Sequence, residues 1–176
     1  SYHNELETKV YNDLAAEIVE TVHNGGEMIL TISLNGVSID NGGETDNDKR
    51  LELAKKYIEE NIRTTRIYNA LICNYPYEMF WYDLMDRSFG SMGYSISTVG
   101  NTTYITSITY YMPVYSDYQD KNSENPKNTL SSSAASKGAK AAANAQEIVN
   151  ANAGKSDMEK LEVYKDAICD LAAYDL

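Results

Sequence analysis

The chain has 176 residues, of which 43% are hydrophobic and 23% are charged, as in one ordinary globular domain or a small domain joined to part of another. A formal net charge of −11 at pH 7 opposes binding to phosphate backbones and anionic membrane surfaces. No apolar run approaches the roughly 20 residues that span a bilayer, so we expect no nucleic-acid partner and no membrane insertion.

The first forty residues predict a helix followed by two strands. Apolar residues recur at every fourth position and predict an amphipathic helix over residues 5–23. They are Leu6, Val10, Leu14, Ile18 and Val22. Residues 28–34 are rich in β-formers and predict a strand. Asn35-Gly36 then predicts a two-residue hairpin turn, with residues 37–39 as a short return strand.

Two helices and a long hairpin are predicted next. Apolar spacing indicates helices over residues 47–62 and 64–74. Thr45 and Asp48 are expected to cap the first, and Pro76 to end the second. Gly100-Asn101 separates two strands, residues 93–99 and 102–114. Alternation in the second strand places four side chains on one face of the sheet. They are Tyr104, Thr106, Ile108 and Tyr110.

The last third of the chain predicts a connector and two helices. Residues 116–133 are polar and aperiodic, which indicates a linker or mobile loop. An alanine-rich helix is expected over residues 134–151. A second helix begins at Ser156, which forms a capping box with Glu159. The predicted fold class is therefore α+β, with amphipathic helices packed on a small antiparallel sheet.

An aromatic segment and the hairpin supply the candidate binding residues. They are Tyr77, Trp81, Tyr104, Tyr110 and Tyr111. Exposed aromatic faces can stack on a glycan or a peptide. For the segment around Trp81 burial is the favoured alternative, with Met79 and Phe80 filling the core beside it.

The residues do not assemble a metal site or a catalytic centre, so we predict no metal, cofactor or catalytic residue. The two histidines, His3 and His23, have no cysteine or second histidine at ligand spacing. The oxygen-rich residues 40–48 depart from the EF-hand pattern, and a surface loop explains them as well as calcium does. Cys169 lies late in a helix beside a carboxylate, which disfavours a thiolate, and it could instead pair with Cys73.

The C-terminal helix carries a family resemblance. It opens with Ser156-Asp157-Met158-Glu159-Lys160-Leu161, continues through Ile168 and ends with Tyr174-Asp175. This pattern resembles the helix before the catalytic cysteine in bacterial transglutaminase-like, papain-like thiol enzymes. It covers about residues 140–176 and includes none of that family's catalytic residues. The 15 tyrosines against two phenylalanines resemble secreted or cell-wall proteins of Gram-positive bacteria.

The resemblance implies the non-catalytic N-terminal portion of an extracellular or cell-wall enzyme. Residues 1–115 would be an accessory domain, 116–133 a linker, and 134–176 the leading helices of a truncated core. The Cys, His and Asp for acyl transfer or peptide hydrolysis would lie in a later segment. The expected partner is that catalytic half or another protein surface, which would leave a broad apolar patch exposed here.

An alternative remains open. The chain could be a self-contained extracellular binding or adhesion module that recognises a protein or glycan through its tyrosine-rich hairpin. That alternative predicts a complete fold without an exposed apolar face.

Overall fold

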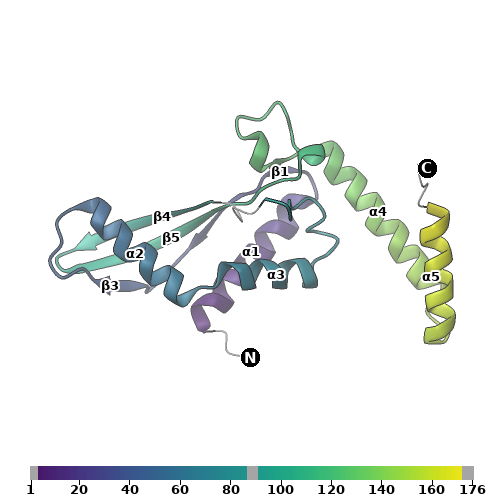
Figure 1. The fold of residues 1–176 in the computed structure, drawn as a ribbon, viewed down its shortest axis with the longest axis horizontal. Coiled ribbons are helices and arrows are strands. Elements are labelled where there is room, and N and C mark those ends of the chain that lie inside the picture. The colour runs from purple at the N-terminus through teal and green to yellow at the C-terminus, as the bar shows by residue number, and fades with distance from the viewer. Residues whose placement is uncertain (1–3, 87–90, 172–176) are drawn as a thin grey trace. The chain divides into compact units, whose positions relative to one another are not determined.

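The computed structural model describes residues 4–86 and 91–171 (Figure 1). It divides into two compact units, residues 1–136 and 137–176. Helices and antiparallel strands are both present, which confirms the α+β class. His3 and the predicted helix end at Tyr174-Asp175 lie outside the described residues.

Strand β5 (Thr102–Tyr111) is the centre of a four-stranded antiparallel sheet in the first unit. Strand β4 (Ser91–Val99) pairs with it along one edge and forms the predicted hairpin, turning at Gly100 with a φ of +58°. Strands β2 (Ile29–Ser33) and β3 (Ser38–Asp40) pair with its other edge, one after the other.

The hairpin predicted at Asn35-Gly36 is wrong, because β2 and β3 both run antiparallel to β5 and do not pair with each other. Hydrogen bonds to β5 are present both before and after the break at Asn35-Gly36. The Leu34 amide donates to the Thr106 carbonyl (2.8 Å), and the Ile105 amide donates to the Val37 carbonyl (3.0 Å). Gly36, with a φ of +76°, thus lets one edge strand bulge outward and resume.

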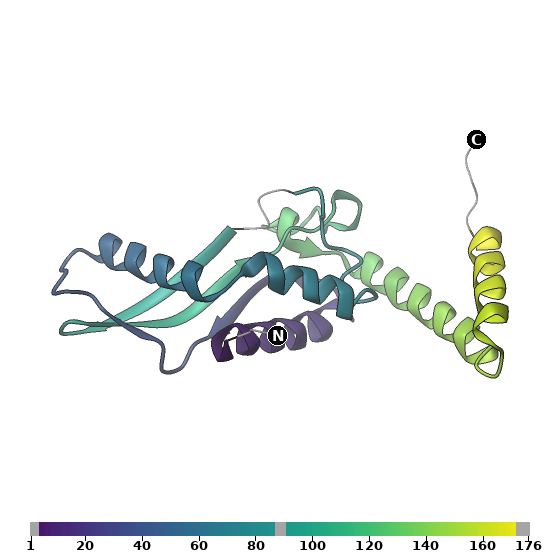
Figure 2. The same cartoon turned by 60° about the horizontal axis from the view of Figure 1, so that its bottom comes forward.

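Three helices supply a large part of the first unit's core (Figure 2). They are α1 (Glu5–Val22), α2 (Asn47–Asn61) and α3 (Thr64–Asn74). The predicted stripe of α1 is buried at Val10, Leu14, Ile18 and Val22. It packs with Leu30, Ile32, Ile105 and Ile108 of the sheet. Neighbouring strand residues that point the other way are mostly exposed or half-buried, so only one face of the sheet is covered.

Side-chain caps fix where the helices begin. Asn4 Oδ1 accepts from the Glu7 amide at the start of α1 (2.7 Å). The cap of α2 is Asp46 rather than the predicted Thr45, because Asp46 Oδ1 accepts from the Asp48 amide (2.9 Å). Both caps satisfy amide groups that have no partner within their own helix.

The segment expected to be a linker, residues 116–133, is part of the first unit. It contains the 3₁₀-helices η1 (Ser116–Tyr118) and η2 (Pro126–Asn128) and the strand β6 (Thr129–Leu130). β6 pairs with β1 (Gly26–Glu27), and the Met28 amide donates to the Asn128 carbonyl (2.6 Å). Composition indicated a loop, but these hydrogen bonds attach it to the core.

The second unit contains most of α4 (Ser132–Ala151) and α5 (Asp157–Leu171). The predicted capping box at the start of α5 is confirmed. The Ser156 amide donates to Glu159 Oε2 (2.8 Å), and the Glu159 amide donates to Ser156 Oγ (3.4 Å). A loop over residues 152–156 separates the two helices.

Two glycines with similar dihedrals provide a test of the packing. At Gly25 a Cβ atom would lie 2.8 Å from the Leu130 carbonyl oxygen, whereas at Gly36 no atom lies within 4 Å. Their φ values are +74° and +76°, so alanine at either site incurs roughly 1–2 kcal/mol of left-handed strain. We expect Gly25→Ala to lower the free energy of unfolding in urea by clearly more than Gly36→Ala. Equal losses would contradict the close contact between residue 25 and β6.

Candidate functional site

The five predicted binding residues are not brought together. Tyr110 points toward the helices and is fully buried, whereas Tyr104 is 41% exposed. Tyr111 is half-buried, Trp81 is fully buried, and Tyr77 is 54% exposed in the loop after α3. The favoured burial of the segment around Trp81 is therefore confirmed for Trp81 itself.

A β-bulge places Tyr104 and Tyr111 on the same, open face of the sheet. The pairing shifts between Ser95 and Ile96 of β4, which leaves Thr106 of β5 without a partner residue in β4. This extra residue reverses the alternation of side chains along β5. The prediction that Tyr104 and Tyr110 share one face is wrong for this reason.

The open face is rich in hydroxyl groups and nearly uncharged. We call it the hydroxyl face, and it consists of Thr31, Ser33, Ser95, Ser97, Tyr104, Thr106, Ser107, Thr109 and Tyr111. The hydroxyls of Thr31 and Thr109 are hydrogen-bonded across the strands at 2.8 Å. Strands β2 to β5 carry one charged residue, Asp40, at the end of β3. Such a surface is unusual on a chain with a net charge of −11.

Tyr111 lies beside the only glycine of β4. A Cβ atom at Gly93 would be 3.6 Å from the Tyr111 ring, which is ordinary van der Waals contact. The ring of Tyr111 thus packs directly over the strand at Gly93. Tyr104 stands further along β5, opposite Ser97 of β4 and Ser38 of β3.

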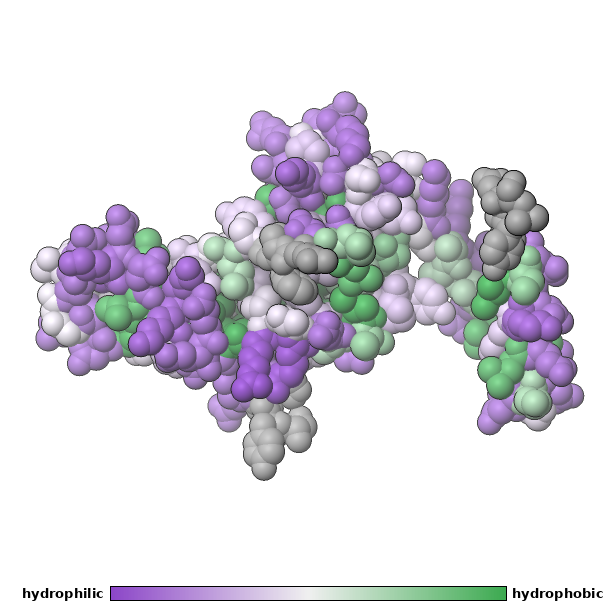
Figure 3. All heavy atoms as spheres, in the orientation of Figure 1, coloured by the Kyte–Doolittle hydropathy of each residue, from purple (hydrophilic) through white to green (hydrophobic). Residues whose placement is uncertain are grey.

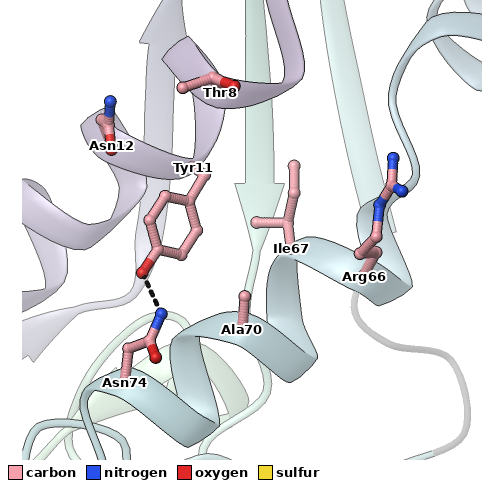
Figure 4. Close-up of a pocket in the computed structure, with 7 residues that line it drawn as sticks. All are labelled: Thr8, Tyr11, Asn12, Arg66, Ile67, Ala70 and Asn74. Carbon is pink, nitrogen blue, oxygen red and sulfur yellow. Dashed lines mark hydrogen bonds between the residues drawn. The ribbon is translucent and has the colours of Figure 1, made fainter. Parts of the chain in front are cut away.

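A small groove lies between α1 and α3 (Figure 4). It has a volume of about 240 Å³ and is lined by Thr8, Tyr11, Asn12, Arg66, Ile67, Ala70 and Asn74. Tyr11 extends across it, and its hydroxyl accepts from Asn74 Nδ2 at 2.7 Å. The volume falls below the roughly 300 Å³ at which small-molecule sites begin. Sequence reasoning missed this groove, although Thr8, Tyr11 and Asn12 share one flank of the first apolar stripe.

The buried carboxylate of Glu7 holds α1 against the start of α3. Glu7 is 2% exposed, and its Oε1 lies 2.6 Å from Arg66 Nη2. Its Oε2 accepts from the Arg63 amide (2.9 Å) just before α3 begins. This ion pair neutralises the one cation that lines the groove, so the groove does not attract anionic ligands.

Three tyrosines meet in the core beneath the sheet. The ring centroids of Tyr68 and Tyr82 are 5.5 Å apart, and those of Tyr68 and Tyr110 are 6.2 Å apart, both in edge-to-face geometry. Within the part of the chain that the structure describes, none of their three hydroxyls has a hydrogen-bond partner. Aromatic packing therefore stabilises this cluster, while the buried hydroxyls oppose it.

Burial also changes how these phenols ionise. Desolvation, followed by the nearby Asp86 and Asp83, raises the pKa of Tyr82 from 10.0 to about 12. Desolvation raises the pKa of Tyr110 as well, and the neighbouring Thr64 hydroxyl opposes that shift.

Three large apolar side chains of α5 are exposed. Met158, Leu161 and Ile168 are 70%, 65% and 66% exposed. They follow helical spacing and share one side of the helix with Lys165. We call these three apolar residues the α5 stripe. The space-filling view shows hydrophobic residues among hydrophilic ones on this helix (Figure 3).

The other candidate residues from the sequence do not form a metal site within the described residues. Cys73 and Cys169 are both free and exposed, each in a different unit. In the loop before α2, side-chain oxygens accept hydrogen bonds from nearby backbone amides. The Gly42 amide donates to Asp40 Oδ1 (2.9 Å), and the Gly43 amide donates to Asn41 Oδ1 (2.9 Å). Among residues 4–86 and 91–171 there is no group of three acidic, histidine or cysteine side chains placed to hold a metal. Within the same ranges, no helix has the length and apolar character to cross a bilayer.

Comparisons with known proteins identify no relative of this chain. No protein-family model matches the chain, and neither the curated proteins nor the solved structures gave a match.

The tyrosine cluster predicts how stability depends on pH. Because the pKa of Tyr82 is higher in the folded chain, its contribution is fully present below pH 10 and is lost as pH rises toward 12. We expect the free energy of unfolding to fall over this range, and Tyr82→Phe to make the fall shallower. Urea denaturation at a series of pH values measures it, with exposed Tyr104→Phe as the control. An equal slope in wild type and Tyr82→Phe would contradict the assignment.

Proposed function

We propose that this chain is a non-catalytic portion of a secreted or cell-wall transglutaminase-like protein, in which the second unit docks on a catalytic domain. The proposal is carried by the α5 stripe, which leaves three large apolar side chains exposed on one helix. The segment Ser156–Leu161, on which the family resemblance depends, forms the capped start of α5.

The second unit has almost no core of its own. Among the side chains described in residues 137–170, Asn152 is the one that is buried. The half-buried residues on α4 are small, including Gly138, Ala142 and Ala145, with Ile148 as the one large apolar member. Helices of this length depend on tertiary packing for most of their stability. A further surface over α5 would supply that packing.

Burial of the α5 stripe would contribute substantially to such docking. Covering a leucine, isoleucine or methionine side chain contributes about 1.5–3 kcal/mol each. The rest of α5 carries five acidic and two basic residues. A partner surface that is apolar at its centre and basic at its rim would therefore match it. The role supported for this chain is to position or shield a catalytic domain that contains the Cys, His and Asp.

The gene beyond the codon for Leu176 tests the family assignment directly. The proposal requires an open reading frame with a cysteine within a few tens of codons, then a histidine and an aspartate. A stop codon would contradict it. Iodoacetamide-sensitive turnover by the 176-residue chain would also contradict it, because this portion is proposed to be non-catalytic.

The α5 stripe can be tested on the chain itself. We expect the double variant Leu161→Ser and Ile168→Ser to lose at least half of the fluorescence of a bound hydrophobic dye, with helical circular dichroism retained. Leu84→Ser is the matched control, because Leu84 is 69% exposed in the first unit. Negligible dye binding by the wild type, or an equal loss in the control, would contradict an accessible apolar surface on α5.

The hydroxyl face favours a second candidate, an extracellular binding module for a glycan or peptide. Its hydroxyl groups and the exposed ring of Tyr104 provide the hydrogen bonds and the stacking surface that sugars use. Its near neutrality avoids the repulsion that the rest of this acidic chain would exert on an anionic cell-wall polymer.

A matched pair of tyrosine variants tests this candidate. With a soluble oligosaccharide of N-acetylated hexosamines, Tyr104→Ala should weaken binding about 10-fold, which corresponds to ~1.4 kcal/mol. Tyr77→Ala should leave it unchanged, because Tyr77 is similarly exposed but lies outside the hydroxyl face. Isothermal titration calorimetry measures both. No binding by the wild type, or equal losses in the two variants, would contradict a glycan site on this face.

A further inference from the structure

The two edges of the four-stranded sheet differ in how they are protected. The edge formed by β2 and β3 is interrupted at Asn35-Gly36, and Lys9 Nζ donates to the Ser33 carbonyl (2.9 Å). This edge also ends with a charged residue, Asp40. Interruption and charge are the devices by which soluble proteins prevent a sheet edge from pairing with another chain.

The β4 edge has none of these devices. Its nine residues, Ser-Met-Gly-Tyr-Ser-Ile-Ser-Thr-Val, include no charged side chain and no proline. The extra residue of the bulge belongs to β5, so β4 itself is not interrupted. Among the strands that the structure describes, β5 alone pairs with β4. Its outer edge therefore offers a long, neutral row of backbone groups for pairing.

The charge around β4 favours a second copy of this chain as the occupant. Two copies with a net charge of −11 each repel at most surfaces, but β4 itself is uncharged. The helix packed nearest to it, α2, is also balanced, with four acidic and four basic residues. This edge is thus a region where two copies can approach without like-charge repulsion.

We propose that β4 pairs with β4 of a second copy in antiparallel orientation, joining two sheets into one. Such a contact is isologous and follows two-fold symmetry. A pairing centred on Ser95 keeps the alternation of both strands in phase. It sets Tyr94 of each copy beside Ile96 of the other, an aromatic and β-branched pair that stabilises sheets. It also joins the hydroxyl faces of both copies into one surface.

Sedimentation of the full chain over a range of concentrations tests the pairing. The wild type should form a species of twice the 19.7 kDa chain mass. The double variant Ser95→Lys and Ser97→Lys should weaken dimerisation at least 10-fold, because it places like charges across the new strand pair. Both serines are exposed, so these substitutions leave the core intact.

The matched control is Ser33→Lys, which adds a lysine to the same face at the opposite edge and should leave the dimer unchanged. Hydrogen exchange should also show slower amide exchange in residues 91–99 as the concentration rises. A chain that stays monomeric at several hundred micromolar would overturn the proposal. A dimer that Leu161→Ser and Ile168→Ser dissociate, with β4 exchange unaffected, would place the contact on the α5 stripe and also overturn it.

Discussion

Strand β5 determines how the first unit is built, because it is hydrogen-bonded along both of its edges. β4 occupies one edge, and β2 and β3 share the other. The side chains of β5 therefore point either into the core or onto the open face of the sheet. Ile105, Ile108 and Tyr110 enter the core, whereas Tyr104 and Tyr111 remain on the hydroxyl face. The bulge at Thr106 makes this division possible, since it changes the phase of alternation between the two halves of the strand.

Two polar groups in the core contribute in opposite ways. Glu7 is buried but bonded to Arg66 and to the amide before α3, so its charge fixes the arrangement of two helices. The hydroxyls of Tyr68, Tyr82 and Tyr110 are buried without described hydrogen-bond partners. Their rings fill the space between α3 and the sheet, and the cost of the desolvated hydroxyls reduces what that packing contributes. Phenylalanine would fill most of the same volume at those positions without this cost.

The sequence predicted the helices well because their signals are local. The stripe of α1, the capping box at Ser156 and the stop before Pro76 each depend on residues within a few positions of one another. The β4–β5 hairpin was also predicted, whereas the pairing of β2 and β3 depends on distant residues and was not. Asn35-Gly36 has the composition of a hairpin turn, but both flanking strands pair with β5, whose partner residues lie 62 to 82 positions away. The bulge at Thr106 has no local sequence signal, so Tyr104 was predicted to share a face with Tyr110 instead of Tyr111.

The predicted binding residues also show that composition does not determine where a side chain lies in the fold. Aromatic content selected Tyr104 and Tyr111, which lie on the hydroxyl face, and it equally selected Trp81 and Tyr110, which are buried. The signal that separates them is serine, because Ser95, Ser97 and Ser107 all lie on the uncovered face, whereas threonine also occurs on the covered face, where Thr103 is fully buried. Composition alone cannot distinguish a tyrosine that packs on helices from one that lies among serines.

The two units differ in what stabilises them, and this difference has functional consequences. The first unit has a continuous core drawn from helices and sheet, whereas the helices of the second bury almost nothing of their own. The capping box of α5 contributes about 1 kcal/mol, which is small beside the conformational entropy of ordering 15 residues. A surface that covers the α5 stripe would therefore stabilise the helix and bind it in the same step. On the proposed function, docking and helix formation in the second unit would be coupled, while the core of the first unit does not depend on that contact.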